Sequence, residues 1–179
     1  KMSKLKNLTI LHSNDMHGDF QAEQVDDKLI GGVSFLSGYI QKVREEEENV
    51  LYVVSGDMFR GSVIDSEFKG LSTIEIMNLL GPDVATLGNH EFDYGMAGCI
   101  TAIENADFPY VSCNFRHEEN GAAGNLVLNS YQILQSCGKK LAFVGITTPE
   151  TITSAAPAYF QDESGDYIYG IDGGEDGED

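Results

Sequence analysis

Three apolar stretches of this chain each end in a short polar cluster that contains glycine, and this repeated arrangement limits the folds open to it. The stretches cover residues 8–12, 50–54 and 83–87. Residues 50–54 are almost entirely apolar, which is typical of a strand covered on both faces. Segments with helical spacing lie between the stretches, so consecutive strands are joined by crossovers and run parallel. We therefore expect an α/β fold.

The other elements follow from hydrophobic periodicity and turn residues. Apolar residues between 33 and 43 recur at helical spacing, which predicts a helix. The sequence Ser-Thr-Ile-Glu at 72–75 is a capping box and predicts a helix that runs to residue 80, before Gly81-Pro82. We further expect a helix over 95–106, a strand over 110–113, a polar loop around residue 120, and two strands over 130–136 and 140–146 joined at Gly138-Lys139 by a type II′ turn.

The polar clusters contain side chains that bind divalent cations. Ligands of open α/β sheets bind beyond the carboxyl ends of the strands, so we expect the three clusters to meet at one edge of the sheet. Carboxylates, amide oxygens and imidazoles are suitable ligands for a pair of cations that attacks a phosphate ester. The candidates are Asp15 and His17 in the first cluster, Asp57 in the second, and Asn89 and His90 in the third.

Composition and charge argue against several other classes. With 29 acidic against 11 basic residues and a net charge of −18, the chain is unsuited to duplex nucleic acid. No apolar run has the length of a transmembrane segment, and no signal peptide is visible, so we expect a cytosolic chain or one whose leader is absent. Three cysteines without a CxxC pair argue against a disulfide framework and a thiolate zinc site. Neither a G-x-G-x-x-G fingerprint nor a P-loop is present.

The last residues differ in composition from the rest. From 161 to 179, acidic residues and glycines accumulate and no basic residue occurs. The segment superficially resembles a calcium loop, but Gly174 stands at the third ligand position and no glutamate stands at the twelfth. We expect one domain over 1–160, followed by an acidic Gly-rich loop or tail over 161–179.

The motifs Asp-x-His, Gly-Asp-x-x-x-Gly and Gly-Asn-His-Glu together resemble those of the calcineurin-like metallophosphoesterase superfamily. The stretches at residues 8–18, 89–95 and 144–149 more narrowly resemble the 5′-nucleotidase family. The resemblance covers nearly all of residues 8–160. It implies a four-layer α/β/β/α metallophosphatase fold, incomplete at its C-terminal side, with residues 1–160 as the N-terminal part of the domain and a dinuclear metal site at the sheet edge.

The resemblance also implies a role for each candidate. Asp15 and His17 would bind the first metal, Asp57 would bridge both, and Asn89 would bind the second. His90 would act on the phosphoryl group and Asp93 would orient it. Two divalent ions are implied, with zinc, manganese, iron and cobalt all open. From the residues alone, alternatives remain: turn residues for Asp15, Asp57 and Asn89, an exposed histidine for His17, a supporting hydrogen bond for His90, and a helix-start carboxylate for Asp93.

Two further residues near the motifs are open to interpretation. His12 lies within an apolar run and is expected to be a core histidine. Arg60 is the one basic residue within a motif, with a phosphate contact set against a surface position.

The leading function is hydrolysis of nucleoside 5′-monophosphates by a metal-activated hydroxide, hence nucleotide breakdown. The alternatives are a 2′,3′-cyclic nucleotide phosphodiesterase, a nucleotide-sugar hydrolase, or a fragment that keeps the fold without turnover. The family pattern requires further histidines and a C-terminal substrate-binding domain, and no histidine follows His117. The expected partner is a small phosphate ester. The expected location is extracellular, cell-surface or periplasmic, by resemblance.

Overall fold

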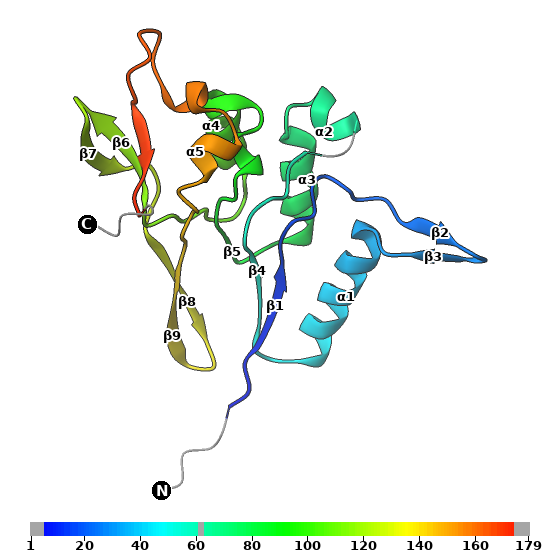
Figure 1. The fold of residues 1–179 in the computed structure, drawn as a ribbon. Helices are drawn as coiled ribbons and strands as arrows, with labels where there is room; N and C mark the ends of the chain where they lie inside the picture. Colours follow the sequence, from blue (N-terminus) through cyan, green and yellow to red (C-terminus); the bar gives the residue numbers. More distant parts are fainter. Residues whose placement is uncertain (1–5, 61–62, 174–179) are drawn as a thin grey trace, which may run out of the picture.

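The computed structural model describes residues 6–60 and 63–173 (Figure 1). Its helices are α1 (Val33–Glu46), α2 (Val63–Glu67), α3 (Leu71–Leu80), α4 (Gly95–Asn105) and α5 (Thr151–Ser154), with 3-10 turns η1 (His90–Phe92) and η2 (Pro157–Phe160). Its strands are β1 (Thr9–Ser13), β2 (Glu23–Val25), β3 (Lys28–Ile30), β4 (Val50–Val54), β5 (Val84–Ala85), β6 (Phe115–Glu119), β7 (Ala122–Leu126), β8 (Tyr131–Ser136), β9 (Lys139–Val144) and β10 (Tyr169–Ile171).

The first sheet has the parallel arrangement that the sequence predicts. β4 lies between β1 and β5, and both pairings are parallel. Tyr110 extends the sheet through a parallel bridge to Ala85, so the strand expected over 110–113 is reduced to isolated bridges. The α/β class is confirmed, and the carboxyl ends of β1, β4 and β5 meet at one edge.

Helices cover one side of this sheet and enclose the core (Figure 1). α3 packs against both α1 and α4, and a cluster of buried apolar side chains lies between the helices and the sheet. Tyr52, Ile74, Met77 and Phe92 are each exposed by 1% or less. This core fixes the strands whose ends carry the polar clusters.

The capping box expected at 72–75 is wrong, although the helix itself is present. α3 begins at Leu71, directly after Gly70, whose backbone is left-handed with φ 86°. The N-cap position is thus a glycine, which has no side chain to cap the helix, and the Thr73 hydroxyl donates to the buried carboxylate of Asp65. Gly81, with φ 65°, ends the helix as expected.

The region expected to be a polar loop around residue 120 is a hairpin. β6 and β7 pair in antiparallel fashion around Asn120 and Gly121, whose φ angles of 55° and 76° suit a type I′ turn. β10 pairs with the other edge of β6. Part of the segment 161–179, expected to be a loop or tail, is therefore a strand, and residues 174–179 lie outside the described ones.

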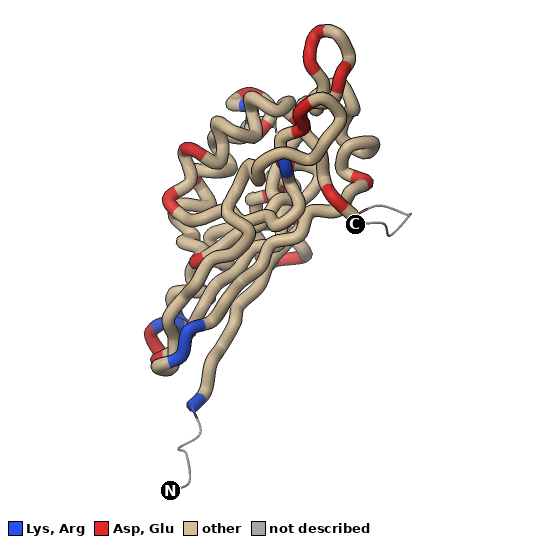
Figure 2. Tube along the Cα trace, turned by 90° about the vertical axis from the view of Figure 1, so that its left-hand side faces the viewer, with Lys and Arg blue, Asp and Glu red and all other residues tan. Residues whose placement is uncertain are grey.

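The hairpin of β8 and β9 is confirmed, but its turn differs from the prediction. Ser136 pairs with Lys139, so Cys137 and Gly138 form the loop. Both have positive φ, 55° and 69°, which defines type I′ rather than II′. Basic residues gather at this end of the molecule (Figure 2).

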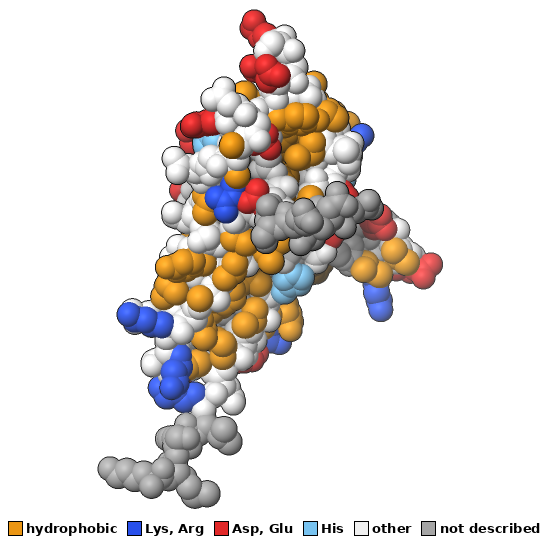
Figure 3. All heavy atoms as spheres, turned by 60° about the vertical axis from the view of Figure 1, so that its left-hand side comes forward, with side chains coloured by type: hydrophobic (Ala, Val, Ile, Leu, Met, Phe, Trp, Pro, Cys, Tyr) orange, Lys and Arg blue, Asp and Glu red, His pale blue; other side chains and the backbone are white. Residues whose placement is uncertain are grey.

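On the side formed by β1, β8 and β9, an apolar face is open to solvent. Figure 3 shows apolar side chains gathered there, and Tyr131 and Val144, which pair across β8 and β9, are 53% and 59% exposed. Alternation along β1 points His12 outward too, where its Nε2 lies 2.8 Å from Ser55 Oγ. The expectation of a core histidine is therefore wrong. No helix among the described residues is both long enough and apolar enough to pass through a membrane.

Candidate metal centre

The first two polar clusters are joined by a short backbone ladder. The Asp15 N–H donates to the carbonyl of Gly56 at 3.1 Å, and the His17 N–H donates to that of Asp57 at 3.1 Å. These bonds continue the parallel pairing of β1 and β4 beyond the sheet edge. Asp15 and His17 are therefore held beside Asp57.

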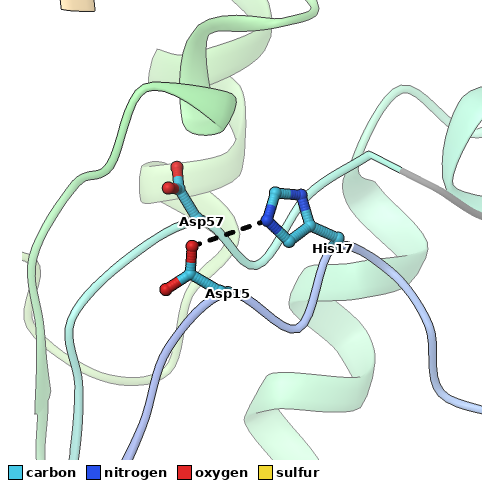
Figure 4. Close-up of side chains that lie close together, drawn as sticks. All are labelled: Asp15, His17 and Asp57. Atoms are coloured by element: carbon cyan, nitrogen blue, oxygen red, sulfur yellow. Dashed lines mark ion pairs between the residues drawn. The ribbon is translucent and has the colours of Figure 1, made fainter.

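Asp15, His17 and Asp57 each point one metal-binding atom toward a common space (Figure 4). The three atoms lie within 4.8 Å of one another, and His17 Nε2 is 3.6 Å from Asp15 Oδ1. Asp15 is exposed, whereas the other two are half-buried. The Asn14 side-chain amide donates to the Asp15 carboxylate. Two carboxylates and one imidazole fit a divalent transition-metal ion.

The backbone is left-handed at each of these three residues. The φ angles are 53° at Asp15, 49° at His17 and 55° at Asp57. A left-handed conformation costs a non-glycine residue of order 1–3 kcal/mol and persists only where its surroundings impose it. Here the backbone ladder imposes it. Clusters of such residues are typical of functional sites.

The third cluster reaches Asp57 through its backbone. The His90 N–H donates to Asp57 Oδ1 at 2.9 Å, which places the neighbouring Asn89 close to Asp57. Gly88 makes this approach possible, because a Cβ there would lie 2.2 Å from Asp57 Oδ1. One carboxylate oxygen of Asp57 is thus held by the third cluster.

His90 and Asp93 form a hydrogen-bonded pair beside the cluster. His90 Nδ1 lies 2.7 Å from Asp93 Oδ2, and the His90 ring centroid is 4.6 Å from that of His17. A carboxylate only accepts hydrogen bonds, so the ring proton is on Nδ1 and Nε2 is left for other partners. Arg60, whose side chain is 64% exposed, places Nη1 3.6 Å from the same Asp93 oxygen.

Two buried carboxylates near the site were not identified from the sequence. Glu91 is 1% exposed and accepts hydrogen bonds from three backbone amides. Burial raises the pKa of Glu91 to about 7, although those amides lower it. Asp65, also 1% exposed, accepts from the Arg60 N–H at 2.7 Å and the Tyr94 hydroxyl at 2.6 Å. Burial, with Asp65 as hydrogen-bond partner, raises the pKa of Tyr94 to about 12.

The fold and the grouped side chains agree with those expected of a metallophosphoesterase, and comparison of the sequence with known families identifies the family. The model of the calcineurin-like phosphoesterase family matches residues 8–167, and the chain belongs to this family. The resemblance to this superfamily that the motifs indicated is confirmed.

Individual relatives are nucleotidases. Mouse 5′-nucleotidase is 36% identical over 173 residues, and a snake venom 5′-nucleotidase of Gloydius brevicauda is 34% identical over 168 residues. Each match covers 87% of this chain, with 29% and 28% of the relative, so the chain spans under a third of their length.

Solved structures give the same result for the fold. A 5′-nucleotidase precursor from Thermus thermophilus is 28% identical, with a TM-score of 0.71, over 80% of this chain and 29% of that one. The NAD nucleotidase of Haemophilus influenzae is 26% identical, with a TM-score of 0.76, over 93% and 29%. The α/β metallophosphatase fold is confirmed.

Proposed function

We propose that this chain carries metal ligands and the acid–base pair of a phosphoesterase that hydrolyses nucleoside 5′-monophosphates to nucleoside and phosphate. The observation that carries the proposal is the cluster of Asp15, His17 and Asp57 beside the His90–Asp93 pair. The nucleotidases among the relatives support a nucleotide as substrate.

In this proposal, four candidate side chains would bind two divalent ions. Asp15 and His17 would bind the first ion, Asn89 would bind the second, and Asp57 would bridge them. Two bound ions supply hydroxide at neutral pH and neutralise charge on the phosphoryl oxygens. A bridging carboxylate suits this role because it lies between two like charges that otherwise repel.

His90 would serve the leaving group. Asp93 would accept the Nδ1 proton in a hydrogen bond and keep the ring in place, and the doubly protonated ring would then donate its Nε2 proton to the leaving ester oxygen and return to the neutral form. Asp93 also stabilises the positive charge on the ring before that transfer. Arg60, which shares the Asp93 oxygen, adds a positive charge at the edge of the site.

A second candidate is cleavage of a dinucleotide or nucleotide sugar. The NAD nucleotidase of Haemophilus influenzae covers 93% of this chain at 26% identity, which favours this alternative. Both reactions break a phosphate ester or anhydride bond and require the same ligands and acid. Comparing hydrolysis of adenosine 5′-monophosphate with that of NAD separates them.

Metal retention and hydrolysis, measured on the same samples, test the proposal. Wild type, Asp57→Asn and His90→Ala are loaded with Mn²⁺, Co²⁺ or Zn²⁺, passed through a desalting column, and analysed for metal and for phosphate release. We expect Asp57→Asn to lose both properties. His90→Ala should keep the metal and lose about 10²–10⁴ in rate. A wild-type chain without metal overturns the proposal, and retained metal without hydrolysis supports a fold that binds without turnover.

A further inference from the structure

Glu91 lies at the junction of the second and third polar clusters. Its Oε2 accepts from the N–H of Asp57 at 2.9 Å and from that of Gly88 at 2.7 Å. Its Oε1 accepts from the N–H of Met58 at 2.9 Å. One buried carboxylate therefore binds amides from two loops. They are the loop after β4, called the second loop, and the loop after β5, called the third loop.

These loops are joined differently from the first two. Asp15 and His17 are tied to the second loop by backbone bonds. The last backbone bond between β4 and the third strand region runs from the Thr86 N–H to the carbonyl of Val54. Beyond it, within residues 6–60 and 63–173, the hydrogen bonds between the second and third loops all have a side-chain carboxylate as the acceptor. The carboxylates are those of Glu91 and Asp57.

We infer that Glu91 is a positioning residue that sets the distance between Asp57 and Asn89, the proposed ligands on the second and third loops. This inference rests on the proposed function. Asp57 must present a free oxygen while its other oxygen is held by the third loop. Glu91 fixes the backbone at Asp57 itself and at Gly88, directly before Asn89. A shift of either loop changes the distance between the ligands.

The alternative is that Glu91 only stabilises the fold. Glu91→Gln separates the two roles because it keeps the size of the side chain. It replaces one accepting oxygen by an NH₂ group, which then faces an amide N–H and cannot accept from it. Depending on which oxygen is replaced, Glu91→Gln loses either the bond from the Met58 N–H or both bonds from the N–H groups of Asp57 and Gly88. Residues that orient metal ligands typically contribute 10–100-fold to metal affinity.

Asn114→Ala is the matched control. Asn114 is buried and accepts from the N–H of Thr147 at 3.0 Å, so its loss also costs stability. It contacts neither of the two loops through any hydrogen bond recorded for the described residues. A variant that is merely less stable should behave like this control.

The experiment measures three quantities on the 179-residue chain. They are the Co²⁺ dissociation constant by calorimetry, the visible absorption spectrum of bound Co²⁺, and the thermal midpoint without metal. We expect Glu91→Gln to raise the dissociation constant 10–100-fold and to change the spectrum. Asn114→Ala should lower the midpoint while the affinity stays within about threefold.

Each result decides the inference. Wild-type affinity and spectrum in Glu91→Gln, with a lowered midpoint, would show a purely structural role and overturn it. A wild type that binds no Co²⁺ would overturn the proposed function as well, so the two failures are distinguishable. If Glu91→Gln does not fold, Glu91→Asp replaces it. Glu91→Asp keeps the charge but withdraws the oxygens by one methylene; lost affinity in the folded variant supports positioning, and unchanged affinity overturns it.

Discussion

Gly88 contributes to the site because it has no side chain. A Cβ at this position would lie 2.2 Å from Asp57 Oδ1 and 2.7 Å from the Asp57 nitrogen. Gly88→Ala must therefore push Asp57 away from the third loop. We expect a loss of about 1–3 kcal/mol in the free energy of unfolding, as for overpacking in a core. Metal affinity should fall at least about tenfold, by analogy with lost ligand support.

Gly38→Ala is the control for that variant. Gly38 lies in the middle of α1, and nothing lies within 4 Å of the position its Cβ would take. Alanine there should stabilise the helix by about 0.5–1 kcal/mol and leave metal binding unchanged. Urea denaturation and calorimetry measure both effects. Normal metal binding by Gly88→Ala would show that Asp57 is not confined as the structure indicates.

Glu91 makes stability depend on pH in the metal-free protein. Burial raises its pKa from 4.5 to about 7, so between these values the folded state holds a proton that the unfolded state releases. The free energy of unfolding should therefore fall as the pH rises from about 4.5 to about 7, by up to about 3 kcal/mol. Denaturant titrations at several pH values, on wild type and Glu91→Gln in the presence of a chelator, measure this change in the free energy of unfolding. The variant should lack this component, and an equal slope in both would contradict the assignment.

The elements predictable from the sequence are those with strong periodicity. α1 and α4 were predicted close to their observed bounds, and β4 was predicted correctly, because each buries a face against the core. The hairpin of β6 and β7 was missed, although Asn120-Gly121 is a strong turn signal. Its strands are short and rich in charged or small residues, without alternation that a reader of the sequence could detect. The capping box failed because Gly70 already supplies the turn into α3.

Asn114 joins elements that are distant in the sequence. Its side-chain amide donates to the carbonyls of Thr147 at 2.7 Å and Asp172 at 2.9 Å, and its oxygen accepts from the Thr147 N–H at 3.0 Å. Asn114→Ala leaves these groups without their partner and should lower the free energy of unfolding by about 1–3 kcal/mol. Urea denaturation measures the change. A loss below about 0.5 kcal/mol would mean that water replaces the lost bonds.

At the scale of the whole molecule, the sequence predicted which residues of the candidate site come together, but not the hydrogen bonds that hold their loops in place. Order along the chain and parallel topology bring Asp15, His17 and Asp57 together, as the spacing predicts. The hydrogen bonds of Glu91 could not be predicted, because they depend on how two loops from different strands lie in space. The proximity of Asp15, His17 and Asp57 is observed, but the roles of all six candidates, these three with Asn89, His90 and Asp93, stay predictions until metal binding and hydrolysis are measured.

A net charge of −18 raises the question of whether metal binds the site or the acidic surface in general. A ligand that binds only the folded state at a hundredfold excess over its dissociation constant stabilises it by about 2.7 kcal/mol. For a chain of this size, that corresponds to a rise in the thermal midpoint of about 5–10 °C. We expect Mn²⁺ to produce such a rise and a chelator to reverse it.

Two variants that each remove one negative charge distinguish cation binding at the site from cation binding to the acidic surface. Asp57→Asn changes a candidate ligand, whereas Asp162→Asn changes a carboxylate in an exposed loop, where it accepts from the Ser164 N–H at 2.9 Å. The rise with Mn²⁺ should disappear in Asp57→Asn and persist in Asp162→Asn, because only the first variant loses a ligand of the cluster. Scanning calorimetry with and without Mn²⁺ measures the difference. Equal responses from the two variants would mean that the cation binds through the overall negative field of the chain.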